Sequence, residues 1–293
     1  MYRYRHRFVP ALAAAITITC IGFTPAAAAP VSVTKVLLFV EENHSLAEMK
    51  AGMPYLYSQA TTYGYATNYA AIRHPSLPNY LAIAGASTFN VVDDAAPSSH
   101  PIVGRSVFGA AITAVRSAKS YQESMTSNCR LTNSGRYAVK HNPWAYFTGE
   151  RTKCQVNDVP SGTYTSGALH NDIVNGTLPN VGEVTPNLDN DAHDGSLGRA
   201  DTWLKNWFTL IYASPDWKAG RLAIIVLADE DDSTQGNKVL TTVIHRSQSH
   251  RVVATALTHY SLTGLLTQLT HAPCINAGCS AANMATAFAL PLG

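Results

Sequence analysis

The sequence predicts an α/β protein built on a mostly parallel β-sheet between helices. Residues 33–40 (VTKVLLFV) and 222–228 (LAIIVLA) are almost continuously apolar. Such runs are typical of parallel strands, which are buried on both faces. Acidic residues follow each run directly, beginning with Glu41 after the first and Asp229 after the second. Because ligands bind beyond the carboxyl ends of strands in open α/β sheets, we expect the two acidic clusters to converge on one site.

The first 29 residues have the pattern of a secretory signal peptide. A basic start at residues 3–7 precedes an apolar run over residues 8–23, and small residues 26–29 follow. We expect cleavage near Ala29, which leaves a single secreted domain from residue 30 to residue 293. A retained N-terminal anchor is the alternative. The apolar run is short for a membrane-spanning helix and no second long run follows it, so we expect no stable membrane insertion.

The composition is that of a globular protein without a nucleic-acid partner. Hydrophobic residues make up 46% of the chain and charged residues 14%, which excludes a disordered chain. The formal net charge is only +2. Binding to a phosphate backbone needs clustered Lys and Arg, which the sequence lacks.

Four cysteines follow the leader: Cys129, Cys154, Cys274 and Cys279. An even number in an exported protein favours two disulfides. Pairing of Cys129 with Cys154 and of Cys274 with Cys279 is the simplest of the three connectivities. A cysteine-rich zinc site is the alternative, although neither pair has the tight double spacing of such a site.

Helical spacing of apolar residues predicts three helices. One begins at or beside Ser76, one covers residues 201–211 with Asp201 as its cap, and one covers residues 260–269. Between the first two, residues 87–186 are rich in Ser, Thr, Asn, Gly and Pro. We expect long, partly irregular loops there.

The two strand ends supply oxygen donors for a divalent cation. The candidate metal ligands are Glu42, Asn43, Asp229 and Glu230. Carboxylate and amide oxygens suit hard cations, although a solvated acidic turn is the alternative for each cluster. For Asp231 and Asp232, which lie further from the strand, we favour the solvated turn.

Ser76 is the candidate nucleophile. Backbone N–H groups at a helix N-terminus bind phosphate oxygens, and an adjacent metal would lower the pKa of the hydroxyl. The alternative is an ordinary helix cap. Asn79, three residues further on, is a candidate substrate contact.

Two loops add polar candidates. In residues 186–196 (PNLDNDAHDGS), His193 would be a general acid or a ligand, oriented by Asp194. In the second loop Lys140, His141 and Asn142 would bind the substrate phosphate. Solvated turns are the alternative for the first loop. His259, at a helix start, is as readily a buried structural histidine as a ligand.

Six segments taken in order resemble the bacterial and fungal phosphoesterase family, which includes acid phosphatases and phospholipases C. They are residues 40–45 (VEENHS), 74–81 (HPSLPNYL), 137–144 (YAVKHNPW), 186–196, 201–204 (DTWL) and 229–232 (DEDD). The resemblance implies an alkaline-phosphatase-like three-layer sandwich. It also implies that Glu42, Asn43, Asp229 and Glu230 hold the metal and that Ser76 forms a phosphoserine intermediate. His193 and Asp194 fall on the family's second active-site block, and Lys140 and His141 on the loop before it.

The expected function is therefore that of a secreted, metal-dependent acid phosphatase that hydrolyses phosphate monoesters. Its partner would be a phosphorylated small molecule or a phospholipid headgroup, and a short secreted branch of the family implies phosphoinositides. All-oxygen ligation favours magnesium, calcium or manganese, and nearby histidines leave iron or zinc open. The rival functions are a phospholipase C-like phosphodiesterase at the same site, a serine carboxylesterase, and a secreted binding protein. The carboxylesterase lacks a G-x-S-x-G motif and leaves both acidic clusters unexplained.

Overall fold

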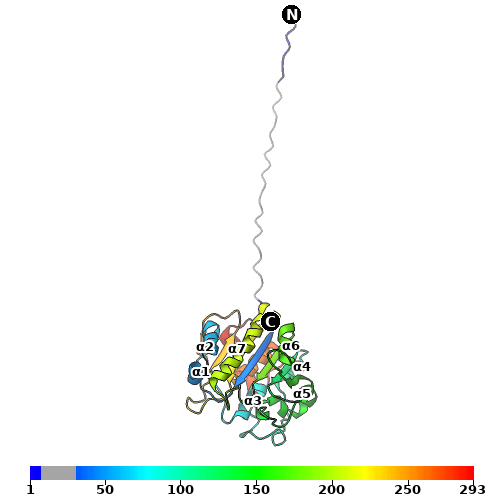
Figure 1. The fold of residues 1–293 in the computed structure, drawn as a ribbon. Helices are drawn as coiled ribbons and strands as arrows, with labels where there is room; N and C mark the ends of the chain where they lie inside the picture. The colour runs from blue at the N-terminus through cyan, green and yellow to red at the C-terminus, as the bar shows by residue number, and fades with distance from the viewer. Residues whose placement is uncertain (8–30) are drawn as a thin grey trace. The chain divides into compact units, whose positions relative to one another are not determined.

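Strands and helices alternate along much of the chain. The computed structural model describes residues 1–7 and 31–293 (Figure 1). The strands of these residues are β1 (Lys35–Glu41), β2 (Gly64–Ala66), β3 (Tyr69–Ala70), β4 (Ala118–Gln122), β5 (Asp158–Pro160), β6 (Val181–Thr185), β7 (Leu222–Ala228), β8 (Thr241–Ile244), β9 (Arg251–Val253) and β10 (Leu257–Thr258). The α-helices are α1 (Leu46–Gly52), α2 (Pro54–Thr62), α3 (Ser76–Gly85), α4 (Val107–Thr113), α5 (Arg151–Asn157), α6 (Ala168–Asn175), α7 (Leu197–Ala213), α8 (Pro215–Lys218), α9 (His259–Leu269) and α10 (Met284–Phe288).

An eight-stranded sheet organises residues 31–293. Its strands follow the order β5-β4-β6-β1-β7-β8-β2-β9, and β10 pairs with β3 in a separate two-stranded sheet. Every pair from β5 through β7 is parallel, as is the pair of β2 and β9. Only β8 runs antiparallel to its neighbours β7 and β2 in this sheet of the described residues. The predicted α/β class with a mostly parallel sheet is confirmed.

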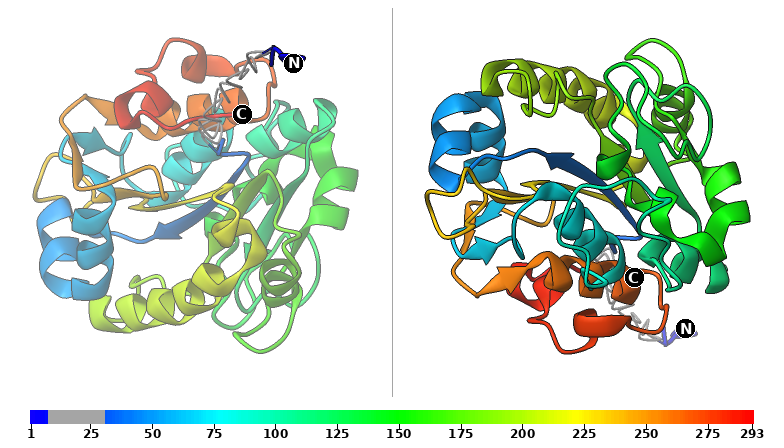
Figure 2. Two further views of the ribbon diagram at one scale, coloured as in Figure 1. Left: turned by 90° about the horizontal axis from the view of Figure 1, so that it is seen from above. Right: turned by 90° about the horizontal axis from the view of Figure 1, so that it is seen from below.

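Helices cover both faces of this sheet. Helices α3, α4, α9 and α10 pack together on one face, and α1, α2, α6, α7 and α8 pack on the other (Figure 2). Three short 3₁₀ helices, Val139–His141, Pro143–Tyr146 and Thr148–Glu150, follow one another before α5. The first of them carries two of the predicted site residues.

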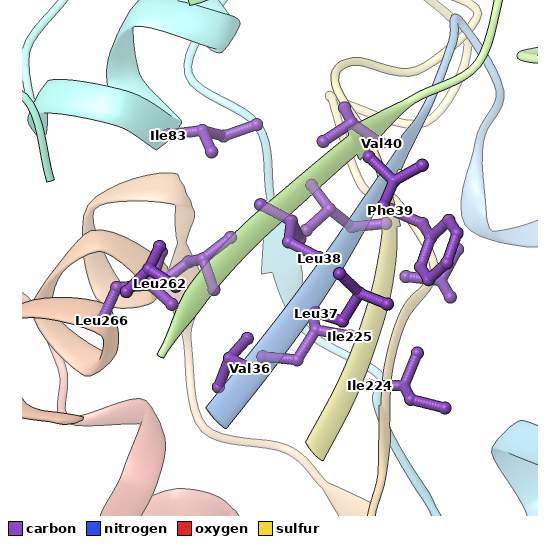
Figure 3. Packing of buried hydrophobic residues seen from close by; sticks show 14 of the residues in the cluster. Val36, Leu37, Leu38, Phe39, Val40, Ile83, Ile224, Ile225, Leu262 and Leu266 are labelled. Carbon is purple, nitrogen blue, oxygen red and sulfur yellow. The ribbon is translucent and has the colours of Figure 1, made fainter. Parts of the chain in front are cut away.

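The core forms where β1 and β7 lie at the centre of the sheet. Side chains of β1 alternate between the two faces, as the pleat of a strand requires. Leu38 lies on the side of Ile83 and Leu262, and Phe39 lies on the other side (Figure 3). There the Phe39 ring meets Trp203 of α7 edge-on, with the ring centroids 6.0 Å apart. All residues of β7 are buried, in agreement with the apolar run that predicted this strand.

Two sequence-based predictions about this fold are wrong. Residues 87–186 contain α4, α5, α6 and the sheet strands β4, β5 and β6, in addition to loops. These strands are short and include polar residues that are buried, so they lack the apolar runs of β1 and β7. Asp201 lies inside α7, whose N-cap is Ser196. The Asp201 carboxylate instead accepts hydrogen bonds from Tyr55 N and Leu56 N, at the start of α2.

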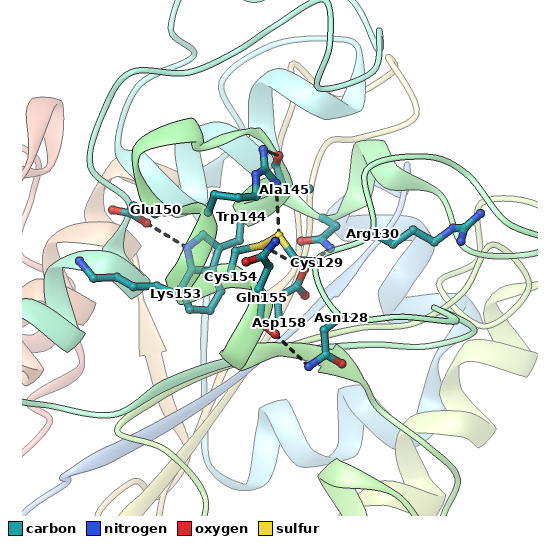
Figure 4. The surroundings of a disulfide bond; sticks show 12 residues. Asn128, Cys129, Arg130, Trp144, Ala145, Glu150, Lys153, Cys154, Gln155 and Asp158 are labelled. Carbon is teal, nitrogen blue, oxygen red and sulfur yellow. Dashed lines mark hydrogen bonds between the residues drawn. A yellow bond between two sulfur atoms is a disulfide. The ribbon is translucent and has the colours of Figure 1, made fainter.

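Both expected disulfides are present. Cys129 is joined to Cys154, and Cys274 to Cys279. The first bond lies beside Asp158 and Trp144 (Figure 4). It ties the loop after β4 to α5, and so fixes the segment that contains the 3₁₀ helices.

The predicted signal peptide, residues 1–29, falls largely outside the described residues. Residues 1–7 carry no regular secondary structure. Within residues 1–7 and 31–293, no helix has the length and hydrophobicity that crossing a bilayer requires.

Candidate active site

The carboxyl ends of β1 and β7 meet, as the sequence predicts. The two strands are parallel neighbours, with Glu41 paired to Ala228 at their ends. Glu42 therefore follows β1 at the point where Asp229 and Glu230 follow β7. The backbone N–H of Asn43 donates to Asp229 Oδ1 across 3.1 Å. The four predicted metal ligands thus lie at one edge of the sheet.

Ser76 lies directly against this acidic cluster. It is the first residue of α3, after the N-cap Pro75, and its side chain is almost completely buried. Its hydroxyl donates to Glu42 Oε2 across 3.0 Å and lies 3.5 Å from Glu230 Oε1. The structure therefore brings the predicted nucleophile together with the predicted metal ligands.

Lys140 supplies a positive charge at the same point. Its Nζ lies 3.5 Å from Ser76 Oγ and 3.0 Å from Asp94 Oδ2. Burial lowers the pKa of Lys140, but the carboxylates of Glu42 and Asp94 outweigh burial and raise it above its usual value. Lys140 is therefore a cation fixed beside the nucleophile.

Burial raises the pKa values of the clustered carboxyl groups. The pKa of Asp229 rises to about 7. For Glu230 burial and then the charge of Asp229 raise the pKa to about 9, and the same two causes raise the pKa of Glu42 well above its usual value. Like charges that are crowded and desolvated disfavour ionisation unless a cation neutralises them.

The residues present fit a divalent cation. Among the described residues, several buried side-chain atoms at this site lack a hydrogen-bond partner, including Glu42 Oε1, Asp229 Oδ2, Asp191 Oδ2 and His141 Nε2. In the described part of the chain, Glu42, His141 and His193 each offer one ligand atom, and these atoms lie within 4.8 Å of one another. Buried polar atoms are normally satisfied, so these orphaned donors of carboxylate and imidazole type indicate a cation.

His141 belongs to the acidic cluster, although the sequence predicts a substrate contact. It is buried, and its Nε2 lies 3.0 Å from Glu42 Oε1 while its Nδ1 lies 3.2 Å from Asp191 Oδ2. These pairs are close but are not aligned as hydrogen bonds. Burial and then the charge of Lys140 lower the pKa of His141 well below its usual value. A neutral imidazole is the form that binds metals.

His193 and Asp194 lie together, as the sequence predicts. His193 Nδ1 lies 2.7 Å from Asp194 Oδ1, and His193 Nε2 lies 3.3 Å from Lys140 Nζ. Arg136 extends this series of side-chain contacts. Its guanidinium donates to Asp194 Oδ2 across 2.8 Å and also to Asp189. One nitrogen of His193 is thus held by a carboxylate while the other faces the site.

Two predicted substrate contacts are corrected by the structure. Asn142 is buried, and its amide donates to Tyr137 Oη and Asp158 Oδ2, so it stabilises the segment around the disulfide. Asn79 is also buried. Its oxygen accepts from Ile72 N, and its nitrogen donates to Glu230 Oε2 across 3.1 Å. Both asparagines are buried and position other groups, although Asn142 Oδ1 itself has no hydrogen-bond partner among the residues that the structure describes.

Asp231 is a further correction. We expected a solvated turn, but its side chain is buried. Its Oδ2 accepts from the backbone N–H groups of Gln235 and Asn237. His74 Nε2 lies 3.2 Å from Asp231 Oδ1, while His74 Nδ1 lies 3.0 Å from Glu230 Oε2. Asp231 therefore organises the loop after β7, and Asp232 stays partly exposed as expected.

His259 holds the backbone of the site in place at Asp229. It is fully buried, its Nε2 lies 2.6 Å from the Asp229 carbonyl oxygen, and its Nδ1 lies 3.1 Å from Tyr69 Oη. Both nitrogens are occupied. Of the two roles left open by the sequence, the structure supports the buried structural one.

Asp94 and Asp191 were not predicted as site residues. Asp94 Oδ1 accepts a hydrogen bond from Leu77 N across 2.9 Å. Asp191 is buried, its carbonyl oxygen accepts from Glu42 N, and its carboxylate accepts from His193 N. Asp191 lies in the loop of residues 186–196 that the sequence singles out, but only the tertiary structure distinguishes it from the other acids of that loop. Nothing in the local sequence marks Asp94.

Comparisons of the sequence agree with this geometry. The profile of the phosphoesterase family matches residues 39–245. A phosphatidylinositol-3-phosphatase of Mycobacterium tuberculosis is 29% identical over 268 residues, which are 88% of this chain and 85% of that protein. A phosphate-repressible acid phosphatase of Penicillium chrysogenum is 28% identical over 213 residues, 68% of this chain. The chain spans 50% of that fungal relative.

Solved structures show the same fold. A protein of the alkaline phosphatase superfamily from Vibrio parahaemolyticus superposes with a TM-score of 0.57 at 11% identity, covering 84% of this chain and 68% of that one. A lipoteichoic acid synthase, LtaP, from Listeria monocytogenes gives 0.55 at 8% identity, covering 83% and 73%. The expected alkaline-phosphatase-like sandwich is confirmed by these likenesses.

Proposed function

Since the chain belongs to the phosphoesterase family, and is thereby a hydrolase of phosphoric esters, we propose that it is a metal-dependent acid phosphatase acting on phosphate monoesters. The observation that carries this proposal is the position of Ser76. Its hydroxyl lies at the first residue of α3, hydrogen-bonded to Glu42 and 3.5 Å from Lys140 Nζ. A nucleophile, a fixed cation and the N-terminus of α3 therefore lie together.

In the proposed first step Ser76 Oγ attacks the phosphorus of the substrate. The new bond joins Oγ to phosphorus, and the bond from phosphorus to the ester oxygen breaks in line with it. Glu42 Oε2 accepts the hydrogen bond of the Ser76 hydroxyl, orients the nucleophile and takes up its proton as the new bond forms. Lys140 and the N-terminal amides of α3 stabilise charge on the phosphoryl oxygens.

Glu42, Asn43, Asp229 and Glu230 would hold the metal, with His141 as a further donor. A divalent cation bound there supplies charge neutralisation and lowers the pKa of the serine hydroxyl. The protein's own contribution is to keep these donors fixed. Asn79 holds Glu230, and His259 holds the backbone of Asp229.

His193 is proposed to protonate the leaving alcohol. Its Nδ1 is held by Asp194, so its Nε2 is left to face the site. In the second step water attacks the phosphoserine and His193 accepts a proton from that water. The bond from phosphorus to Ser76 Oγ breaks, Glu42 returns its proton to Oγ, and inorganic phosphate leaves.

Phosphoinositides are proposed substrates, because the mycobacterial relative carries that activity in its name and aligns with 88% of this chain. The basic and apolar pattern of residues 1–29 supports the further proposal that a signal peptide exports the enzyme. N-terminal sequencing of the protein from the culture medium tests the second proposal. A start near residue 30 is expected, and a retained N-terminus would contradict it.

Turnover of p-nitrophenyl phosphate and bis-p-nitrophenyl phosphate, with and without chelator, tests the activity itself. We expect monoester turnover that chelation abolishes and that added divalent cation restores. Predominant diester turnover would replace the proposal by a phospholipase C-like activity. Activity that is indifferent to chelation would contradict metal dependence.

A further inference from the structure

Ser76 is covered in this structure by the groups that surround it. The residue is 1% exposed, yet the proposed attack requires a phosphoryl group to lie against its hydroxyl. Of the two charged neighbours on the outer side, Lys140 is 19% exposed and Asp94 is 31% exposed. A phosphoryl group can therefore reach the Ser76 hydroxyl only if the side chains of Lys140 and Asp94 make room for it.

The Asp94 carboxylate occupies two donors that a phosphate would use. Its Oδ1 accepts from Leu77 N, the second amide of α3, across 2.9 Å. Its Oδ2 lies 3.0 Å from Lys140 Nζ, the same atom that lies 3.5 Å from Ser76 Oγ. A helix N-terminal amide and a lysine ammonium are the pair of groups that bind phosphate oxygens in many proteins. Here an anion of the protein itself is bound by both.

The loop around Asp94 is held in place without Asp94. The neighbouring Asp93 pairs with His100 across 2.6 Å and accepts from Ala95 N across 2.9 Å. The carbonyl oxygen of Ala95 accepts from Tyr146 Oη across 3.0 Å. Because these contacts tie the loop on both sides, the Asp94 side chain is free to leave its donors while the loop keeps its position.

We propose that Asp94 is a resident anion that fills the phosphate position beside Ser76 and that the substrate phosphate displaces it. This inference rests on the proposed phosphatase function of the same site. A phosphate monoester carries more charge and more acceptor oxygens than a carboxylate, so it wins the exchange at Leu77 N and Lys140. A neutral ester or a carboxylate ligand does not displace Asp94 from these donors. Asp94 thereby makes the site selective for phosphate.

Phosphate can bind only to the molecules in which Asp94 has left its donors. The apparent affinity for phosphate is therefore the intrinsic affinity multiplied by the fraction of such molecules. Removing the charge of Asp94 should therefore tighten phosphate binding. Asp94→Asn keeps the shape and keeps an acceptor for Leu77 N, whereas Asp94→Ala removes both interactions. Asp93→Asn is the matched control, because it removes an identical charge from the adjacent residue without touching Leu77 or Lys140. Its amide oxygen can still accept from Ala95 N and His100, so the loop keeps its position.

The experiment uses the full-length enzyme with its divalent cation and inorganic phosphate as the probe. Phosphate affinity is measured by calorimetry and by competitive inhibition of p-nitrophenyl phosphate turnover. We expect Asp94→Asn and Asp94→Ala to bind phosphate about five- to tenfold more tightly, with KM reduced by a similar factor. Asp93→Asn should bind as the wild type does. Circular dichroism shows whether each variant is folded, and Asp94→Asn alone suffices if the alanine variant is not.

Unchanged or weaker phosphate binding by Asp94→Asn would overturn the inference, as would equal tightening by Asp93→Asn. If the wild type hydrolyses monoesters while the Asp94 variants bind phosphate no tighter, only this inference fails. If the wild type neither hydrolyses monoesters nor binds phosphate, the proposed function fails with it.

Discussion

His259 fixes the backbone of Asp229: its Nε2 lies 2.6 Å from the Asp229 carbonyl oxygen. The opposite nitrogen lies 3.1 Å from the Tyr69 hydroxyl, so the buried ring is held at both ends. Burial lowers the pKa of His259 to about 4, which keeps the ring neutral. Asp229 is a proposed metal ligand, and its position therefore depends on a side chain that is 30 residues further along the chain.

His259→Ala should weaken both stability and cation binding. The lost ring leaves a cavity and an unpaired carbonyl, at a cost of about 2–4 kcal/mol in the free energy of unfolding. Loss of support behind a ligand typically lowers metal affinity by about 10- to 100-fold. Tyr69→Phe removes only the hydrogen bond between Tyr69 Oη and His259 Nδ1, and should lower the free energy of unfolding by about 1 kcal/mol. Denaturant unfolding and Mn²⁺ calorimetry measure both effects, and unchanged Mn²⁺ affinity in His259→Ala would contradict the supporting role.

The adjacent acids Glu41 and Glu42 should behave differently when neutralised. Both are buried, but the Glu42 carboxylate accepts a hydrogen bond from Ser76. The Glu41 carboxylate has no hydrogen-bond partner among the described residues. Glu42→Gln should lower kcat/KM at least about 100-fold, with activity partly recovered at high cation concentration. Glu41→Gln should keep activity close to the wild type. If both variants lost the same factor in kcat/KM, the effect would come from the loss of a buried charge and not from the loss of the contact with Ser76.

Arg136 is predicted to act through Asp194 on His193. It donates to Asp194 Oδ2 across 2.8 Å, whereas Arg199 reaches only Asp189 and Asn190. Arg136→Gln should lower kcat about tenfold, and the loss should be larger for phenyl phosphate than for p-nitrophenyl phosphate, because a poorer leaving group depends more on its acid. Arg199→Gln should have little effect on either substrate. A loss that is the same for both leaving groups would argue against a general acid at His193.

Glu183 should make stability fall with rising pH. This residue is buried in β6, and burial, followed by the charge of Asp158, raises its pKa to about 8. A carboxyl group with a raised folded-state pKa stabilises the protein most below its unfolded pKa, and that contribution is lost as the pH rises towards 8. Between pH 5 and pH 8, Glu183→Gln should therefore gain about 3 kcal/mol relative to the wild type. Urea unfolding at the two pH values measures this, and a constant difference between the proteins would contradict it.

The centre of the fold was predictable because burial on both faces leaves a strong pattern. β7 begins and ends where its apolar run does, and the acids after β1 and β7 converge because parallel strands end at one edge. The strands β4 and β6 left no such pattern. Their sequences, AKSYQ and VGEVT, bury polar side chains. Some of these bond to distant residues, as Gln122 does to Thr185, whereas the Glu183 carboxylate has no hydrogen-bond partner within the described parts of the chain.

Residue types in the site were easier to predict than their partners. Ser76 was predicted because a hydroxyl at a helix N-terminus suits phosphoryl transfer and because residues 74–81 resemble the family, although a helix cap was the alternative. His141 and Asn142 are consecutive, yet one faces Glu42 and the other faces Asp158. Only the turn of the 3₁₀ helix Val139–His141 decides this. Asp94 lies 17 residues from Leu77 in a loop, and no local periodicity connects them.

The covalent role of Ser76 is the centre of this account, and trapping its intermediate tests it most directly. Wild-type enzyme and Ser76→Ala are mixed with a phosphate monoester, quenched in acid within a turnover, and digested for mass spectrometry. We expect the mass of one phosphoryl group on the wild-type peptide that contains Ser76, and neither phosphorylation nor turnover in Ser76→Ala. Turnover by Ser76→Ala at the wild-type rate, or a phosphoryl group on another residue, would contradict the assignment of the nucleophile.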